Sequence, residues 1–516
     1  MSSHVSHPMP MEGVSQAAAT TTQTPSTSAE PGTSDGTSPL GEGQTDTAPR
    51  PEYEYFSQDP RFPAKLIVGA LFVGAFFGYL NETLLNVALT PLMSAFGVDK
   101  TTVQWLTTGF LLTMGALTPI TAGLIRGFRT RTMALASLGT FLLGSIICAA
   151  AGSFEVLLAG RLVQAVSAAL TVPLLMNAIL AIYPPEKRGR AMALVAMIFT
   201  VAPALGPTLS GIIVDHLGWR YLFLVTMPFI LLAIGLVMRY LTVDLHEVGP
   251  LRIDMPSAFL STLGFGGLVY AASSFASFSA FRFGALLVGA CLMIGLFARR
   301  QLRLDTPLLD LRAFGHPQFR YAAVILAMAI FLLLGLELLL PMYMQQVLLF
   351  TGTVTGFVLL PASIAEAVMA PVFGNMLDKR GGRAVLLPGG LVMVASLAAL
   401  WWVAAIDSSP IGLGLAFGCF GIAVASAITG ETHGLNALPK ALHPHGTAII
   451  ATLNPVAGAL GAACFVGAAS LGESLSAQTE ARLAMFDGVK LALSISVCCA
   501  VLVLVLSLKI RLVRGG

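Results

Sequence analysis

Charged residues are scarce in this chain. Only 11% of its 516 residues are Asp, Glu, Lys or Arg, and the net charge of +3 is dispersed among short segments. Proteins that bind nucleic acid usually carry a dense basic patch, so this composition argues against nucleic-acid partners. All six cysteines fall within apolar segments, where we expect them to pack as small hydrophobic residues rather than to form disulfides in exposed loops.

Motifs for nucleotide binding, catalysis and metal binding are also missing. No G-x-x-x-x-G-K-S/T loop is present, so ATP is not the expected energy source. No Ser/His/Asp or Cys/His arrangement can be argued from the loops, so an enzyme is not expected. His433, His443 and His445 have spacings that match no standard metal site. We therefore expect neither a cofactor nor a bound metal.

Apolar residues, by contrast, are abundant. They make up 56% of the chain, whose mean hydropathy is +0.82. Such a composition predicts a polytopic membrane protein with the lipid bilayer as a partner. Residues 1–62 differ, because they are rich in Ser, Thr, Pro and Gly and contain no apolar run long enough for a signal peptide. We expect them to form a disordered cytoplasmic tail.

Fourteen apolar runs are long enough to span a bilayer. They lie at residues 65–90, 103–125, 132–151, 154–182, 190–217, 219–241, 256–277, 283–298, 320–347, 353–377, 384–405, 410–432, 446–470 and 489–508. With a cytoplasmic N-terminus, the loops on the inner side hold most of the 29 Lys and Arg residues. The exceptions are Arg161, which lies within a span, and the outer-loop residues Lys100, Arg220, Arg282, Arg482 and Lys490. This asymmetry follows the positive-inside rule and predicts fourteen spans, rather than twelve, with both termini in the cytoplasm.

One loop pattern occurs twice. Residues 123–131 follow the second predicted span, and residues 374–383 follow the tenth. The second copy is similar to the facilitator loop G-x-L-x-D-r-x-G-r-r, and supplies Gly374, Asp378 and Arg383. The first copy has Gly127 where that pattern has Asp. Parallel repeats of this kind indicate two six-helix bundles, at residues 63–242 and 318–512, with two additional spans at 254–300.

The fifth predicted span has an unusual run of small residues and prolines at 202–211. Gly206 and Gly211 let a neighbouring backbone approach closely, while Pro207 removes a helix donor. The run resembles g-x-x-x-G-P-x-x-G-G, the fifth-helix motif of major facilitator exporters.

Two further segments resemble the same family. Residues 81–89 are similar to D-x-T-x-x-N-V-A-L, and residues 158–165 to l-x-x-R-x-x-Q-G. The chain is thereby identified as a member of the fourteen-span drug:proton antiporters of the major facilitator superfamily. The resemblance implies an all-α polytopic fold, a position in the plasma membrane, and proton-coupled export of amphipathic small molecules by alternating access. One departure matters, because Asn81 occupies the usual Asp position and the acid lies at Glu82.

Glu82 and Arg161 are the first candidates for proton coupling. A charge within a span costs about 2.5–3.5 kcal/mol on insertion scales, so it usually faces a cavity or has a partner. Both residues lie about 10 Å below the outer surface, from their positions in helices with a rise of 1.5 Å per residue. We therefore expect them to pair. The pair either carries a proton, since burial and Arg161 act oppositely on the acid, or is a permanent structural bridge.

Glu337 and Glu366 are the next candidates. Glu337 lies near the middle of the ninth span, and Glu366 lies somewhat deeper in the tenth. With Asn86 and Gln164, both are expected to line a substrate cavity between the first, fourth, ninth and tenth spans. The protein is expected to be a monomer. The alternatives to multidrug export are a dedicated transporter of one metabolite with the same fold and a membrane sensor or scaffold that does not transport.

The first prediction concerns topology. On a cysteine-free background, a cysteine at Arg282 is expected to react with an impermeant maleimide in intact cells, because the loop between the two additional spans faces outward. A cysteine at Arg312 is expected to stay unlabelled, because it lies on the inner side. Labelling at Arg312 with silence at Arg282 would invert or remove the additional pair.

Overall fold

A computed structural model describes residues 55–246, 248–249, 254–274, 279–304, 307–406, 408–478 and 480–510. Every regular element among these residues is a helix. Helices are the expected solution in lipid, because each satisfies its backbone hydrogen bonds within one segment. The expected all-α polytopic fold is confirmed.

The first bundle, which we call the N-bundle, follows a short 3-10 helix, η1 (Phe56–Gln58). Its helices are α1 (Ala64–Phe96), α2 (Lys100–Val103), α3 (Trp105–Gly127), α4 (Thr130–Ala149), α5 (Phe154–Ile182), α6 (Pro185–His216), α7 (Tyr221–Leu224) and α8 (Met227–Tyr240). The predicted sixth span is therefore two helices, because α7 ends at Leu224 before α8 begins.

Two helices, α9 (Met255–Ser274) and α10 (Ala280–Gln301), separate this bundle from the C-bundle. The C-bundle contains η2 (Leu311–Gly315), α11 (Pro317–Gln346), α12 (Gly352–Arg380), α13 (Gly382–Ile406), α14 (Pro410–Asn436), η3 (Lys440–Leu442), α15 (His443–Leu475) and α16 (Ala481–Leu508). The last helix begins eight residues before the predicted run at 489–508. The prediction followed apolar residues alone, and the first turns of this helix contain the polar residues Arg482 and Asp487.

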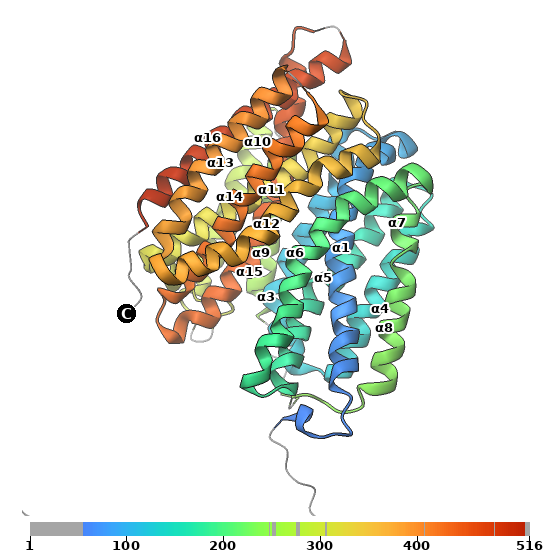
Figure 1. Ribbon diagram of the computed structural model, residues 1–516, viewed down its shortest axis with the longest axis vertical. Coiled ribbons are helices and arrows are strands. Elements are labelled where there is room, and N and C mark those ends of the chain that lie inside the picture. Colours follow the sequence, from blue (N-terminus) through green and yellow to red (C-terminus); the bar gives the residue numbers. More distant parts are fainter. Residues whose placement is uncertain are drawn as a thin grey trace, which may run out of the picture. The chain divides into compact units, whose positions relative to one another are not determined.

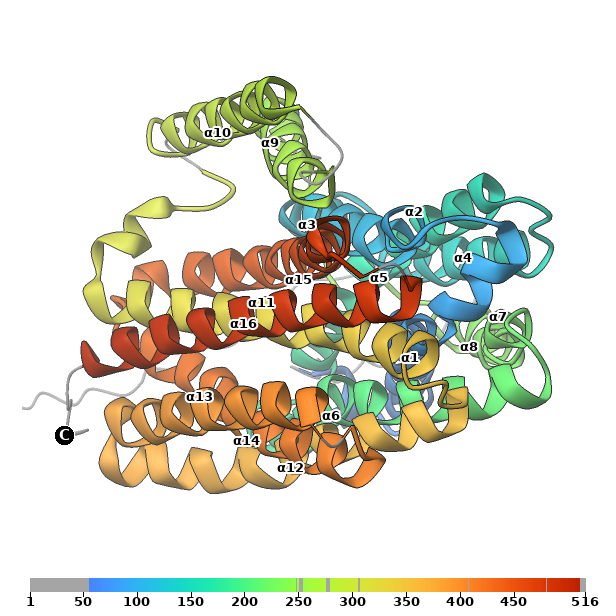
Figure 2. The same cartoon turned by 90° about the horizontal axis from the view of Figure 1, so that it is seen from above.

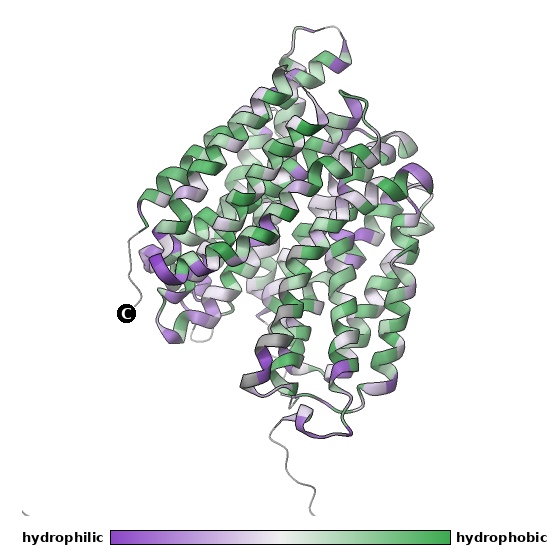
Figure 3. Cartoon of the chain, viewed as in Figure 1, coloured by the Kyte–Doolittle hydropathy of each residue, from purple (hydrophilic) through white to green (hydrophobic). Residues whose placement is uncertain are grey.

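Thirteen helical stretches among the described residues are long and apolar enough to cross a membrane. α3 is 23 residues long, occupies the place of the predicted second span and is not one of these thirteen. Apolar residues cover the middle of the helices, and hydrophilic residues gather toward their ends (Figure 3). This distribution is typical of a multi-pass membrane protein. We call the end where α1 begins the predicted inner end, and the opposite end the predicted outer end.

The additional helices are central in the sequence but peripheral in space. α9 packs against α3 and α15, and α10 packs against α9 (Figure 2). Asp254, just before α9, accepts hydrogen bonds from Arg300 Nη2 at 2.9 Å and Nε at 3.3 Å. Burial acts to raise the pKa of Asp254, but hydrogen bonds from Arg300 and Ser257 outweigh it, so this pKa lies below its ordinary value. The ion pair thus joins the two ends of the helical hairpin.

Folded structure begins earlier than predicted. The disordered tail was expected to extend to residue 62, and residues 1–54 lie outside the described part. Residues 55–62 contain η1, and the rings of Phe56 and Phe62 lie 5.1 Å apart. Both rings pack beside the apolar core of the N-bundle, because burying aromatic surface is favourable.

α6 makes close backbone contacts on two sides. A Cβ atom on Gly206 would lie 2.8 Å from Thr83 Cβ of α1. A Cβ on Gly211 would lie 2.9 Å from Thr353 Cα, and one on Gly356 would lie 2.5 Å from the carbonyl oxygen of Pro207. The expectation that small residues in this run allow close approach is confirmed. Pro203 and Pro207 are both accommodated inside the continuous helix α6.

The second prediction follows from the lack of space at Gly206. Gly206→Leu is expected to separate α1 from α6 and to abolish the expected efflux while the protein still reaches the membrane. Overpacking of this kind costs about 1–3 kcal/mol, which is enough to bias a conformational equilibrium. Gly235→Leu is the matched control, because a Cβ there has no neighbour within 4 Å. Efflux of a fluorescent dye and surface abundance are the measurements. Equal efflux by both variants would contradict the packing role.

Candidate functional site

Arg161 is the centre of a buried polar network in the N-bundle. The side chain projects from α5, is fully buried, and donates from Nη1 to the side-chain oxygen of Asn81 on α1. Nη1 also donates to Gln164 Oε1 at 3.0 Å, and Nε donates to the carbonyl oxygen of Leu106 on α3 at 3.3 Å. The guanidinium carbon lies 4.3 Å from the centre of the Phe110 ring. Arg161 therefore joins three helices.

The described side chains of Arg161 and Glu82, which were expected to pair, form no direct ion pair in this conformation. Asn81 holds the position beside the guanidinium instead. The physical reason is the rotation of about 100° between successive residues of a helix. When Asn81 faces the guanidinium, the Glu82 carboxyl lies beyond ion-pair distance, although its charge still acts on Arg161. Glu82 is 8% exposed, and its Oε2 has no hydrogen-bond partner among the described residues.

Gln164 does not line a cavity in this structure. Its side chain is fully buried, accepts from Arg161, and donates to Ser145 Oγ on α4 at 2.9 Å. The expectation of a substrate contact is therefore not met in this conformation. Because both ends of its amide are already hydrogen bonded, Gln164 orients the guanidinium of Arg161.

Glu337 and Asn86 lie together where the two bundles meet. Asn86 Nδ2 donates to Glu337 Oε2 at 3.4 Å, which connects α1 to α11. Thr107 on α3 donates to Asn86 Oδ1 at 3.5 Å. Glu337 is only 5% exposed. A carboxyl group of the C-bundle is thus held by an amide of the N-bundle.

The carboxyl groups of Glu82, Glu337 and Glu366 lie in one region of the structure. Glu337 lies close enough to both Glu82 and Glu366 for their charges to act on it. Glu366 on α12 is half-buried. Glu82 and Glu366, two of the predicted coupling residues, thus lie near a third, Glu337. The fourth, Arg161, donates hydrogen bonds to Asn81 and Gln164. Such a group of acids can bind protons or an organic cation.

The second loop copy has no latch in this conformation. Asp378 is exposed at the predicted inner end, and neither Asp378 nor Arg383 has a hydrogen bond or ion pair with another described residue. A Cβ on Gly374 would meet nothing within 4 Å. The close contacts lie instead at Gly206 and Gly211. Nothing in this conformation requires glycine at residue 374.

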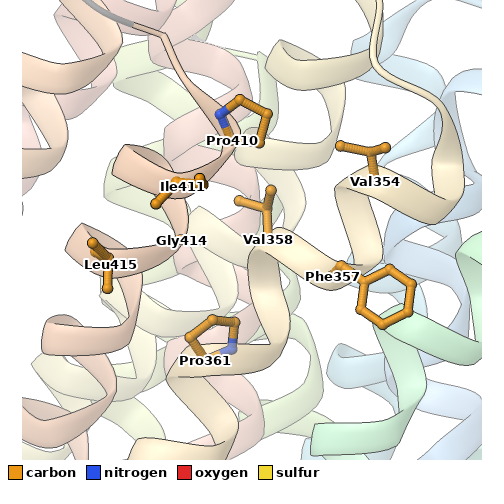
Figure 4. A pocket seen from close by; sticks show the side chains of 8 residues that line it. All are labelled: Val354, Phe357, Val358, Pro361, Pro410, Ile411, Gly414 and Leu415. Atoms are coloured by element: carbon orange, nitrogen blue, oxygen red, sulfur yellow. The ribbon is translucent and has the colours of Figure 1, made fainter.

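A hollow of about 330 Å³ lies between α12 and α14, and no acidic residue lines it. Its lining is apolar and includes Phe357, Pro361, Ile411 and Leu415 (Figure 4). Ile411 is 76% exposed and Leu415 is 66% exposed. Apolar side chains this exposed in a membrane protein face lipid, so this hollow is not the predicted polar cavity.

Residues 71–462 match the model of the Major Facilitator Superfamily. The chain belongs to this superfamily. Its fold agrees with that of a bacterial homologue of the human lysosomal transporter Spinster, with a TM-score of 0.63 and 15% identity over 88% of this chain and 99% of that one. As a major facilitator, the chain is a multi-pass membrane transporter.

Several relatives within the superfamily have names that refer to drug resistance. The chain is 38% identical to the lincomycin resistance protein LmrB of Bacillus subtilis, over 79% of this chain and 86% of that protein. It is 36% identical to LmrB of Listeria monocytogenes, over 80% and 88% of the two chains. It is 28% identical to the multidrug resistance protein Stp of Mycobacterium tuberculosis, over 80% and 76%.

Sequence reasoning missed several contacts of this facilitator that join the two bundles. Lys100 pairs with Glu473 of α15, and Gln345 on α11 donates to the carbonyl oxygen of Val87 on α1 at 2.8 Å. Burial lowers the pKa of Lys100 to about 8, although Asp99 acts to raise it. No local pattern marks such pairs, because their members lie more than 250 residues apart.

The third prediction tests which side chain balances Arg161. Asn81→Ala is expected to lower the thermal unfolding midpoint of the purified protein, because a lost hydrogen bond to a charged group costs about 1.5–3 kcal/mol. Glu82→Gln is the adjacent control and is expected to leave the midpoint nearly unchanged, since Glu82 has no such bond to lose. A fall in the midpoint for Glu82→Gln as large as that for Asn81→Ala would restore the structural bridge between Glu82 and Arg161.

Proposed function

We propose that this protein is a multidrug exporter of the plasma membrane that exchanges cytoplasmic amphipathic molecules for external protons. The unpartnered carboxyl of Glu82, buried beside the group of acids around Glu337, is the observation that carries the proposal. The drug-resistance names of relatives up to 38% identical support the substrate class. The proposal includes fourteen spans, counting α3, a monomeric state and cytoplasmic termini.

The contacts between the bundles support alternating access. Three polar contacts lie at the predicted outer end, where Gln345 reaches Val87, Lys100 meets Glu473, and Thr208 donates to the carbonyl of Gly356 at 3.2 Å. The ribbons of the two bundles diverge toward the predicted inner end (Figure 1). In this proposal, the conformation is the one closed at the predicted outer end.

The coupling step follows from the state of Glu82. A buried charge without a partner costs several kcal/mol, so Glu82 keeps its proton in this conformation. A substrate that enters from the cytoplasm approaches the acids and favours release of the proton to the inner side. After the bundles rock and open outward, substrate leaves and an external proton returns. A charge moved through the membrane potential is worth about 2.3 kcal/mol per 100 mV.

Asn86 and Glu337 have a second role in this cycle. Their hydrogen bond joins α1 to α11 and lies on the boundary that must change when the bundles rock. A substrate that displaces Asn86 from Glu337 weakens that link. The same site thereby senses substrate and releases one contact between the bundles. Glu337 ranks after Glu82 as a proton carrier, and Glu366 follows.

The fourth prediction tests proton coupling. Glu82→Gln keeps the shape of the side chain but cannot titrate, so this variant is expected to bind substrate without accumulating it against a gradient. Substrate-induced proton release from detergent-solubilised protein is also expected to disappear. Substrate-binding affinity, proton release and efflux from proteoliposomes are the measurements.

Matched variants decide among the acids. Glu337→Gln and Glu366→Gln are expected to weaken substrate binding while leaving some proton release. Full gradient-driven efflux by Glu82→Gln would overturn the assignment of Glu82 and move it to Glu337. The absence of substrate-dependent proton release from the unaltered protein, across a panel of dyes, antibiotics and quaternary amines, would overturn the antiport itself.

A further inference from the structure

A carboxylate of one bundle lies at the first turn of a helix in the other. Asp215, in the last turn of α6, accepts from the backbone N–H of Gly352 at 3.1 Å and of Thr353 at 2.7 Å. The hydroxyl of Thr353 also donates to Asp215, at 2.7 Å. The first N–H groups of a helix have no partner within that helix, and the helix dipole favours a negative charge there. Asp215 therefore caps α12 from outside its own bundle.

The backbones around this contact are in direct apposition. A Cβ on Gly211, one turn before Asp215, would lie 2.5 Å from the carbonyl carbon of Gly352. Glycine on α6 thus lets the end of that helix approach near enough for a short Asp side chain to reach the α12 backbone. The contact lies at the predicted outer end, on the opposite side of the bundle boundary from the contact between α3 and α15.

We propose that Asp215 is the outer gate residue of this transporter: its carboxylate holds the first turn of α12 and thereby stabilises the conformation that is closed at the outer end. The proposal rests on the alternating access proposed above. Opening to the outside must separate α6 from α12, and the three hydrogen bonds to Asp215 are then lost together. Asp215 is exposed and Thr353 is partly exposed, while Gly352 is buried. Water can therefore replace the donors on the exposed side of the contact, and the gate remains reversible.

The chain contains a matched control at the same helix end. Thr351 caps α12 from within its own bundle, since its Oγ1 accepts from the N–H of Val354 at 3.2 Å. Thr351→Ala therefore removes a cap from α12 without removing a contact between the bundles. Asp215→Ala removes a cap and a contact together. A difference between the effects of these two variants on the conformation therefore measures the contribution of the contact between the bundles.

The fifth prediction uses a distance across the outer end. Spin labels at Gly152→Cys and Ala477→Cys, both exposed in outer loops of different bundles, report the separation of the bundles in the full-length protein in lipid nanodiscs on a cysteine-free background. Asp215→Ala is expected to raise the ratio of the longer to the shorter distance by about tenfold, and Thr351→Ala to leave it unchanged. Thr353→Val, which removes only the hydroxyl donor, is expected to give a smaller rise in the same direction.

Two outcomes would overturn the gate. Unchanged distances for Asp215→Ala would show that the contact does not hold the closed state. Equal shifts for Asp215→Ala and Thr351→Ala would show that only the stability of α12 matters. Thr353→Val supplies the test if Asp215→Ala does not fold. The measurement needs neither substrate nor a proton gradient, so a failure of the gate is distinguishable from a failure of proton-coupled export.

Discussion

A guanidinium group buried within a membrane protein must be surrounded by acceptors, and this requirement organises the N-bundle around Arg161. The acceptors come from α1, α3 and α5, namely Asn81, the carbonyl of Leu106 and Gln164. Phe110 covers the guanidinium through its ring. These neutral oxygens accept from Nε and Nη1, whereas Nη2 has no hydrogen-bond partner among the described residues. Glu82 forms no ion pair with Arg161, and the proton-carrying role proposed for Glu82 rests on this.

The boundary between the bundles is held by different contacts from those in the interior of each bundle. Close approach there depends on glycine and on backbone atoms, as at Gly211 and Gly356. The polar contacts there join individual side chains to backbone groups or to a few side chains, as at Gln345 and Asp215. A boundary of this kind closes tightly yet separates without exposing a large set of buried charges. That balance suits the alternating access proposed for this protein.

The position of α9 and α10 explains how a twelve-helix architecture accommodates an insertion. α9 packs against both α3 and α15, and α10 packs on α9. At its end, Gln301 of α10 also accepts from the backbone N–H of Leu309 at 3.0 Å. The hairpin is closed by Asp254 and Arg300. Large exposed apolar side chains on α10, such as Phe281 and Val288, face the region where lipid is expected. The insertion therefore adds membrane surface without entering the group of acids.

The sequence alone determined the features that depend on composition and local pattern. Apolar runs set the helices, small residues at Gly206 and Gly211 marked close contacts, and isolated acids at Glu82 and Glu337 marked the polar interior. Only the tertiary structure decided which residue faces Arg161, because Asn81 and Glu82 are neighbours in sequence and a rotation of one residue exchanges them. It also decided the partners of Asp215, since its donors lie on another helix, 137 and 138 residues away. Local periodicity gives the face of a helix that is polar, but the neighbour of that face is set by how the bundles pack.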